Sequence, residues 1–168
     1  MYFSLPTVRT MSMLQEIWKT ILAEFSDLPD TAQTTRIVLR LLVAAILGGL
    51  LGYERERQGK SAGLRTHMLV ALGSALFVLI PQQTGASTEA LTRVLQGLTA
   101  GVGFLGAGAI ITGTKQAETR GLTTAAGIWV TAAIGVAVGM GRESTAVLST
   151  FLALFILSVI PWITRIQK

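Results

Sequence analysis

Long uncharged blocks dominate the second half of the chain, since no charged residue occurs at 94–112, 121–140 or 144–163. Each block has about the length of a helix that crosses a hydrocarbon layer of about 30 Å. None shows the regular polar stripe of a helix in a soluble protein. Two earlier blocks are shorter and carry charge only close to their starts. The pattern therefore predicts five transmembrane helices, at about 36–53, 64–80, 93–112, 121–140 and 144–163.

The segment before these blocks predicts a short amphipathic helix at about 13–25, where apolar residues recur at helical spacing on one face. It is too short to span a bilayer, so it either packs against the bundle or lies in the membrane interface with Trp18 as an anchor. Residues 1–10 are expected to be disordered. The predicted fold class is all-α: an N-terminal tail with the amphipathic helix at 1–34, then a polytopic transmembrane helix bundle at 35–168.

Composition agrees with a membrane protein, because 14% of the residues are charged and 51% are hydrophobic, whereas about 25% are charged in a soluble domain. The chain has no cysteine and one histidine. These counts exclude disulfides and multi-cysteine or multi-histidine metal sites. His67 has no triad-like context and reads as a polar residue at the membrane interface. We predict no enzymatic activity, no metal and no cofactor.

The basic residues predict the orientation in the membrane. One side of the bundle carries most of them: Arg55, Arg57, Lys60, Arg65, Lys115, Arg120, Arg165 and Lys168. By the positive-inside rule this side is the cytoplasm, which places the N-terminus outside and the C-terminus inside.

Glycines inside the blocks predict close helix packing, because small residues let helices approach in a membrane. The third span, rich in glycine, is expected at the centre of the bundle, and the fifth, rich in large apolar residues, is expected to face lipid. The fourth span carries a stripe of Thr123, Gly127, Thr131, Gly135 and Gly139. The candidate packing residues are Gly48, Gly52, Gly97, Gly101, Gly103, Gly106, Gly108, Gly127, Gly135 and Gly139.

Residues 101–106 match the G-x-G-x-x-G fingerprint of dinucleotide-binding proteins. That fingerprint works only after a strand and with an acidic residue about 20 positions later. Here the flanks are predicted membrane helix. We therefore expect neither nucleotide nor nucleic-acid binding.

The polar segment 52–67 joins the first two spans and allows two interpretations. It is either a solvated loop whose charges orient the protein, or a functional site in which Glu54 and Arg65 form an ion pair at the cytoplasmic mouth, since charges at membrane depth are often functional. The functional polar candidates are Arg40, Glu54, Arg55, Glu56, Arg65, Thr66, His67, Arg93, Thr123 and Thr124. Magnesium prefers oxygen ligands, and Glu54 and Glu56 are the carboxylates nearest a span. The pattern does not favour a dedicated cation channel.

Four short blocks resemble blocks of the MgtC/SapB family of membrane proteins. They include GGLLGYERE at 48–56, AGLRTH at 62–67, GVGFLGAG at 101–108 after Arg93, and GLTTAA at 121–126. The resemblance implies a bacterial inner-membrane protein with about five spans that is linked to growth in low magnesium. Virulence-factor members are thought to restrain the proton-driven ATP synthase. They have Asn where this chain has Thr123, and many members carry a C-terminal ACT-like domain. This chain is expected to be a short SapB-like form without it.

The leading hypothesis is a bacterial inner-membrane protein that supports magnesium or ion homeostasis through a membrane protein partner or as a homo-oligomer in the lipid bilayer. The alternative is a small transporter or channel whose path is lined by the third and fourth spans and gated by Arg40, Glu54, Arg65 and Arg93. A structural or assembly role is a third possibility. Flux through proteoliposomes distinguishes the first two.

Overall fold

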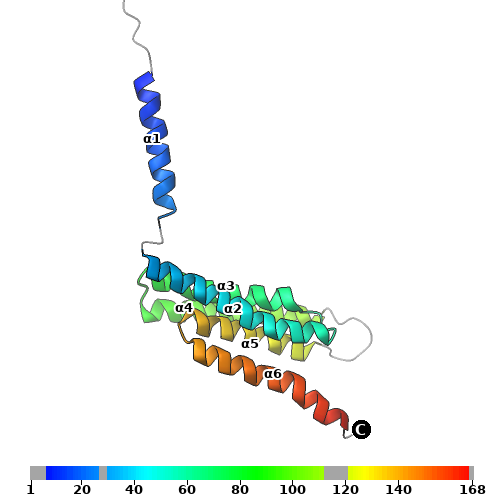
Figure 1. The fold of residues 1–168 in the computed structure, drawn as a ribbon. Coiled ribbons are helices and arrows are strands. Elements are labelled where there is room, and N and C mark those ends of the chain that lie inside the picture. Colours follow the sequence, from blue (N-terminus) through cyan, green and yellow to red (C-terminus); the bar gives the residue numbers. More distant parts are fainter. Residues whose placement is uncertain (1–6, 27–29, 112–120, 167–168) are drawn as a thin grey trace, which may run out of the picture. The chain divides into compact units, whose positions relative to one another are not determined.

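The computed structural model describes residues 7–26, 30–111 and 121–166, and every regular element in these ranges is a helix (Figure 1). The helices are α1 (Thr7–Glu24), α2 (Thr31–Arg57), α3 (Leu64–Gln83), α4 (Thr88–Ile111), α5 (Leu122–Gly139) and α6 (Glu143–Ile166). Five of them, α2 to α6, are long and apolar enough to cross a membrane. The all-α fold class and the five predicted spans are therefore confirmed.

The chain divides into two compact units, Met1–Ile37 and Val38–Lys168. In the first unit, the apolar side chains of the predicted face are exposed on α1 and directly after it: Leu14, Ile17, Trp18, Ile21, Leu22 and Phe25. The predicted disorder up to residue 10 is wrong from Thr7 onward, where α1 begins. The physical reason is that residues 7–11 contain neither glycine nor proline to interrupt the helix.

A polar cap explains why α2 begins earlier than its hydrophobic block. Asp30 precedes the helix, and its Oδ1 accepts a hydrogen bond from the backbone N–H of Ala32 at 3.2 Å. A carboxylate at this position satisfies one of the free N–H groups of the first turn. The helix therefore starts at Thr31, in a polar turn that hydropathy does not detect.

Glycines in the left-handed conformation end three of the helices. Gly59, Gly85 and Gly141 have φ angles of 65°, 70° and 74° and follow α2, α3 and α5. At the end of α2, the N–H of Lys60 donates to the carbonyl of Arg55 at 3.1 Å. This is the six-residue closure of a Schellman motif, in which glycine is favoured because it has no Cβ. These turns fix where the polar residues at the helix ends lie.

Helices α3 and α5 form the centre of the bundle, with α2, α4 and α6 around them (Figure 1). The main apolar core joins α2, α3, α5 and α6 and consists of Ala44, Leu47, Leu51, Ala71, Ala75, Ile134, Val138, Ala146 and Leu157. Small residues permit this close packing: a Cβ on Gly139 would lie 2.7 Å from the carbonyl oxygen of Ala75. The core thus depends on direct approach of helix backbones.

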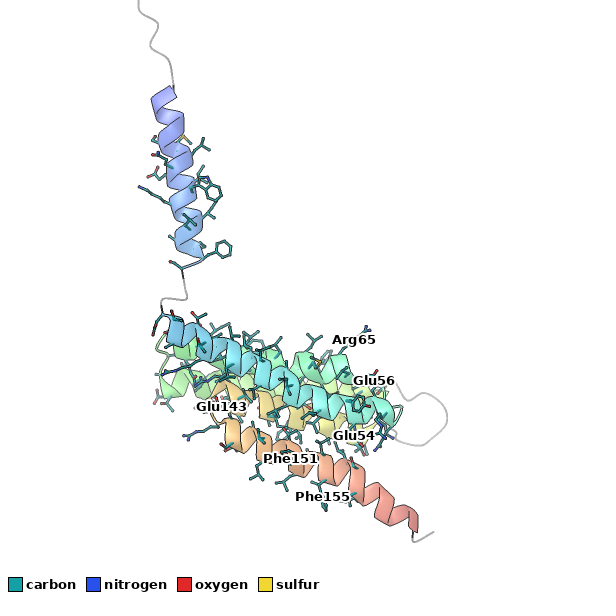
Figure 2. All side chains as sticks on the ribbon, in the orientation of Figure 1. Glu54, Glu56, Arg65, Glu143, Phe151 and Phe155 are labelled. Carbon is teal, nitrogen blue, oxygen red and sulfur yellow. The ribbon has the colours of Figure 1, made fainter. Side chains whose placement is uncertain are left out.

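The central position predicted for the third span is wrong. Half of the α5 span is buried but only 6% of the α4 span. A Cβ on Gly97, Gly101, Gly103 or Gly108 would meet nothing within 4 Å, and among these glycines and Gly106 only Gly106 lies close to α5, near Ala125. Glycine content indicates that a helix can be approached closely, but it does not show whether a neighbour in the same chain does so. The large side chains of α6, including Phe151 and Phe155, are exposed on the outside of the bundle (Figure 2).

Candidate functional site

A polar cluster joins the end of α2 to α6. It consists of Glu54 and Arg55 from α2, of Gln58 directly after α2, and of Leu157 and Ser158 from α6, and we call it the α2–α6 cluster. Among the residues whose side chains the structure describes, Arg55 is the largest that is fully buried, with 1% of its surface exposed. Its guanidinium forms an ion pair with Glu54, and its Nη2 donates to the carbonyl of Leu157 at 3.1 Å. The cluster therefore carries a charge pair deep enough to be shielded from solvent.

The Glu54 carboxylate is fully engaged within the cluster. It accepts hydrogen bonds from Nε of Arg55 and from the side-chain amide of Gln58. Ser158 of α6 donates its hydroxyl to Oε1 of Glu54 at 3.2 Å. Charge-assisted bonds of this kind are stronger than neutral ones, so the carboxylate is held between α2 and α6.

The carbonyl of Leu157 is available to Arg55 because of a proline. In a helix this carbonyl would accept from the N–H four residues later, and that residue is Pro161, inside α6. Proline has no N–H. Arg55 supplies the missing donor, with a weaker contribution from the amide of Gln58 at 3.4 Å. Sequence reasoning missed this signal: a proline inside a span leaves the carbonyl four residues earlier without a donor, and a charged residue of another span can supply one.

Glu56 and His67 organise the connection from α2 to α3. Oε2 of Glu56 accepts the N–H of Leu64 at 2.7 Å and thereby caps the start of α3. His67 is fully buried, with its Nδ1 3.0 Å from the carbonyl of Gly63. A carbonyl only accepts, so Nδ1 carries a proton, and in the neutral imidazole Nε2 is then an acceptor. The sequence analysis took His67 as a polar residue at the interface; in the structure neighbouring helices bury its side chain, because its side of the first turn of α3 faces α2 and α5.

The buried Nε2 of His67 has no hydrogen-bond partner in the described part of the chain. Small residues surround the ring: a Cβ on Gly127 of α5 would lie 3.5 Å from Nε2, and one on Gly52 of α2 would lie 3.0 Å from the His67 Cβ. The imidazole therefore sits where α2, α3 and α5 meet.

Arg40 forms a second polar contact at the opposite end of the bundle. Its Nη1 donates to the carbonyl of Gly139 at 3.1 Å, and its Nε lies 3.5 Å from Oε1 of Glu143. Gly139 is the last residue of α5 and Glu143 the first of α6, so Arg40 links α2 to the turn between them. Glu143 was not among the sequence candidates because it stands just outside the uncharged block.

We predict that Arg40→Met destabilises the protein more than Glu143→Gln. The arginine also bonds the Gly139 carbonyl, whose loss costs about 1–3 kcal/mol. The glutamate side chain is 41% exposed, so its ion pair contributes less than about 1 kcal/mol. Thermal unfolding in detergent measures both, with Arg65→Met as an exposed control. Equal losses for the two variants would contradict this assignment.

The predicted ion pair between Glu54 and Arg65 is wrong. Glu54 is bonded within the α2–α6 cluster, whereas Arg65 is exposed and points away from it (Figure 2). The physical reason is rotation about the helix axis, since the end of α2 directs Glu54 toward α6 and not toward the neighbouring α3.

The other polar candidates do not converge on one site. Thr66, Arg93 and Thr123 are exposed, and Thr124 is buried. Arg93 lies near the start of α4, which follows the end of α3, while Arg65 lies at the start of α3. The two arginines therefore occupy opposite ends of the bundle. Lys115 and Arg120 of the predicted cytoplasmic side lie outside the described residues.

A cavity of about 740 Å³ lies between α3 and α4. Its lining is mainly apolar and includes Leu69, Gly73, Phe77, Gly97, Gly101 and Leu105. The seam between α4 and α5, where the alternative hypothesis placed a transport path, is instead filled by the buried apolar side chains of Val102, Ile128 and Ala132.

Comparison with known proteins finds a family and several relatives that are similar to this chain. Residues 41–166 match the MgtC family. Protein SrpB of Synechococcus elongatus is 44% identical over 138 residues, which cover 76% of each chain. The putative magnesium transporter YhiD of Escherichia coli K12 is 40% identical over 78% of this chain and 63% of YhiD. Protein MgtC of Salmonella typhimurium is 42% identical over 70% of this chain and 49% of MgtC. No solved structure matches the chain.

The matched region contains the α2–α6 cluster and the buried His67. It begins one residue after Arg40, includes the whole α2–α6 cluster, and ends at the last residue of α6. The resemblance inferred from the four sequence blocks is therefore confirmed, and the match covers most of the chain. This five-span helical membrane protein belongs to the MgtC family.

Proposed function

We propose that the chain supports magnesium homeostasis as a regulatory protein of the bacterial inner membrane, acting on another membrane protein. Its N-terminus lies outside and its C-terminus in the cytoplasm, as the distribution of basic residues indicates. A connection with magnesium is supported by the relative YhiD, which is named a putative magnesium transporter.

The observation that carries a regulatory role is the state of Glu54, Glu56 and Glu143, three carboxylates next to the spans. Glu54 is bonded to Arg55, Gln58 and Ser158. Glu56 caps α3 through Leu64, and Glu143 pairs with Arg40. A magnesium ion binds through carboxylate oxygens and retained waters, so it would have to displace contacts that hold the helices together. These carboxylates serve the architecture of the bundle.

The spaces between α4 and its neighbours also support a role without conduction. The seam between α4 and α5 is apolar and filled, and the cavity between α3 and α4 has a mainly apolar lining. An ion that leaves water needs polar groups to replace its hydration shell. The name of YhiD keeps magnesium transport as the competing function.

Two measurements on the purified full chain separate these functions. In proteoliposomes with a magnesium-sensitive dye inside, we expect no flux above that of protein-free liposomes. In a strain that lacks the gene, the wild-type chain should restore growth at low magnesium, and chemical cross-linking should capture a second membrane protein. Magnesium flux that Glu54→Gln and Arg65→Gln abolish would overturn the regulatory proposal.

We predict that Arg65→Gln reduces growth at low magnesium without changing the thermal unfolding of the protein. Arg65 is exposed at the start of α3 and forms no ion pair with the described residues, so its charge is available to a partner. The matched control is Arg142→Gln, an exposed arginine in the turn between α5 and α6, at the opposite end of the bundle. If the two variants grew equally well at low magnesium, the proposed contact of Arg65 with a partner would be contradicted.

A further inference from the structure

Helix α4 has an exposed face made of polar and small residues. Thr92, Gln96, Thr99 and Gly103 are all exposed, and we call these residues the α4 face. Their spacing of four, three and four residues is the spacing of core positions in a left-handed helix pair. The predicted absence of a polar stripe is therefore wrong for α4, because threonine and glutamine are polar without carrying charge.

Exposing the α4 face to lipid costs free energy, chiefly because of the side-chain amide of Gln96. The hydroxyls of Thr92 and Thr99 donate to the carbonyls of Thr88 and Leu95 in their own helix. No hydrogen bond of the Gln96 amide with the described residues is found in the structure. Gln96 lies about 12 Å along the helix from Thr88, which places it at hydrocarbon depth. A polar group there without a partner costs several kcal/mol.

We propose that the α4 face is a contact between two copies of this chain. A carboxamide both donates and accepts, so Gln96 is complementary to itself, as a two-fold contact requires. Two copies inserted by the same basic loops have the same orientation, so their α4 helices run parallel and like positions meet. Gln96 then pairs with Gln96 of the second copy, and Thr99 packs against Thr99.

Gly103 provides the space for this contact. A Cβ at Gly103 would meet nothing within 4 Å of its own chain, so its lack of a side chain serves no packing within the described bundle. In membranes, glycine at a helix contact lets two backbones approach and adds van der Waals attraction. The position of Gly103, seven residues after Gln96, keeps it on the same face.

Two charged residues stand at the start of α4, beside this contact. Glu89 and Arg93 are both exposed and lie one turn apart. Neither forms an ion pair with the described residues. Glu89 lies seven residues before Gln96, so in a parallel pair it faces Glu89 of the second copy. Arg93 of each copy supplies the opposite charge one turn further along the helix.

Cysteine cross-linking in native membranes tests the contact directly, because the chain has no cysteine of its own. We expect Thr99→Cys and Gly103→Cys to give an oxidised product of twice the chain mass. Gly97→Cys and Gly101→Cys, on the side of α4 that lines the cavity to α3, should give little. Preferential cross-linking at Gly97 and Gly101, or products of another mass, would overturn the proposal.

The strength of the contact is measured by dilution of the purified protein into detergent or lipid. Gln96→Leu removes the amide pair and is expected to raise the dissociation constant of the dimer about tenfold. Gly103→Leu should raise it at least as much, and neither change touches the described core of the monomer. Gly101→Leu, equally open in its own chain, is the matched control. Dimerisation unchanged by both Gln96→Leu and Gly103→Leu would contradict the assignment.

Discussion

Replacing Gly135 by leucine is expected to prevent the bundle from folding. Gly135 of α5 lies directly on the backbone of α3, where any Cβ would overlap the carbonyl oxygen of Ala71 and lie 2.9 Å from its Cα. The obstacle is backbone, which does not rotate away as a flexible side chain would. Overpacking at such a position costs more than the 1–3 kcal/mol usual in cores, and we expect about 4 kcal/mol or more.

The measurement is the yield of monodisperse protein by size-exclusion chromatography, together with thermal unfolding in detergent. Gly101→Leu is the control, because the same substitution there meets open space in the described chain. The two variants have equal composition and differ only in the face that they enlarge. If Gly135→Leu gave the same yield and unfolding temperature as Gly101→Leu, the close contact of α3 and α5 would be contradicted.

Arg55→Met is expected to be the most damaging change at a charged residue. It leaves the carboxylate of Glu54 without its positive partner and removes the donor to the carbonyl of Leu157. Breaking a buried ion pair by removal of one partner costs about 3–5 kcal/mol, because the remaining charge is uncompensated. Arg57→Met is the control, since Arg57 is exposed and lies 6.0 Å over the ring of Tyr53. Chemical unfolding in mixed micelles measures both.

A double variant separates the loss of the charge pair from the loss of the carbonyl bond. Adding Glu54→Gln to Arg55→Met removes the uncompensated carboxylate and should recover part of the lost stability. The loss of stability that is not recovered measures the contribution of the hydrogen bond to the Leu157 carbonyl. If the double variant were no more stable than Arg55→Met, the ion pair would contribute nothing and the cluster would act through the carbonyl bond.

Hydropathy predicted the five spans correctly because a helix that crosses a membrane must be apolar over nearly its whole length. The distribution of charge along 94–163 was enough to place three of the helices to within a few residues. Helix ends were predicted less well, since α2 starts in a polar turn capped by Asp30. A side-chain cap is a local contact that an average over 18 residues does not record.

The contacts between helices were harder to predict, because they depend on rotation about each axis. A helix turns by 100° per residue, so Glu54 and Arg55 reach α6 while Arg65, assigned as the partner of Glu54, points elsewhere (Figure 2). His67 was assigned to the interface from its place in the first turn of α3, yet neighbouring helices bury it completely. Sequence position gives the depth of a residue but not the neighbour that it faces.

The bond between Arg55 and Leu157 has a consequence for biosynthesis. The two residues are separated by 102 positions, so α2 is in the membrane well before α6 leaves the ribosome. Until α6 reaches its place, the guanidinium of Arg55 lacks the carbonyl, and the helix around Pro161 lacks the donor. Each helix therefore enters the bilayer without one hydrogen-bond partner, and both partners are supplied in one step when α6 docks on α2. A chain truncated before Leu157 should be retained by membrane quality control.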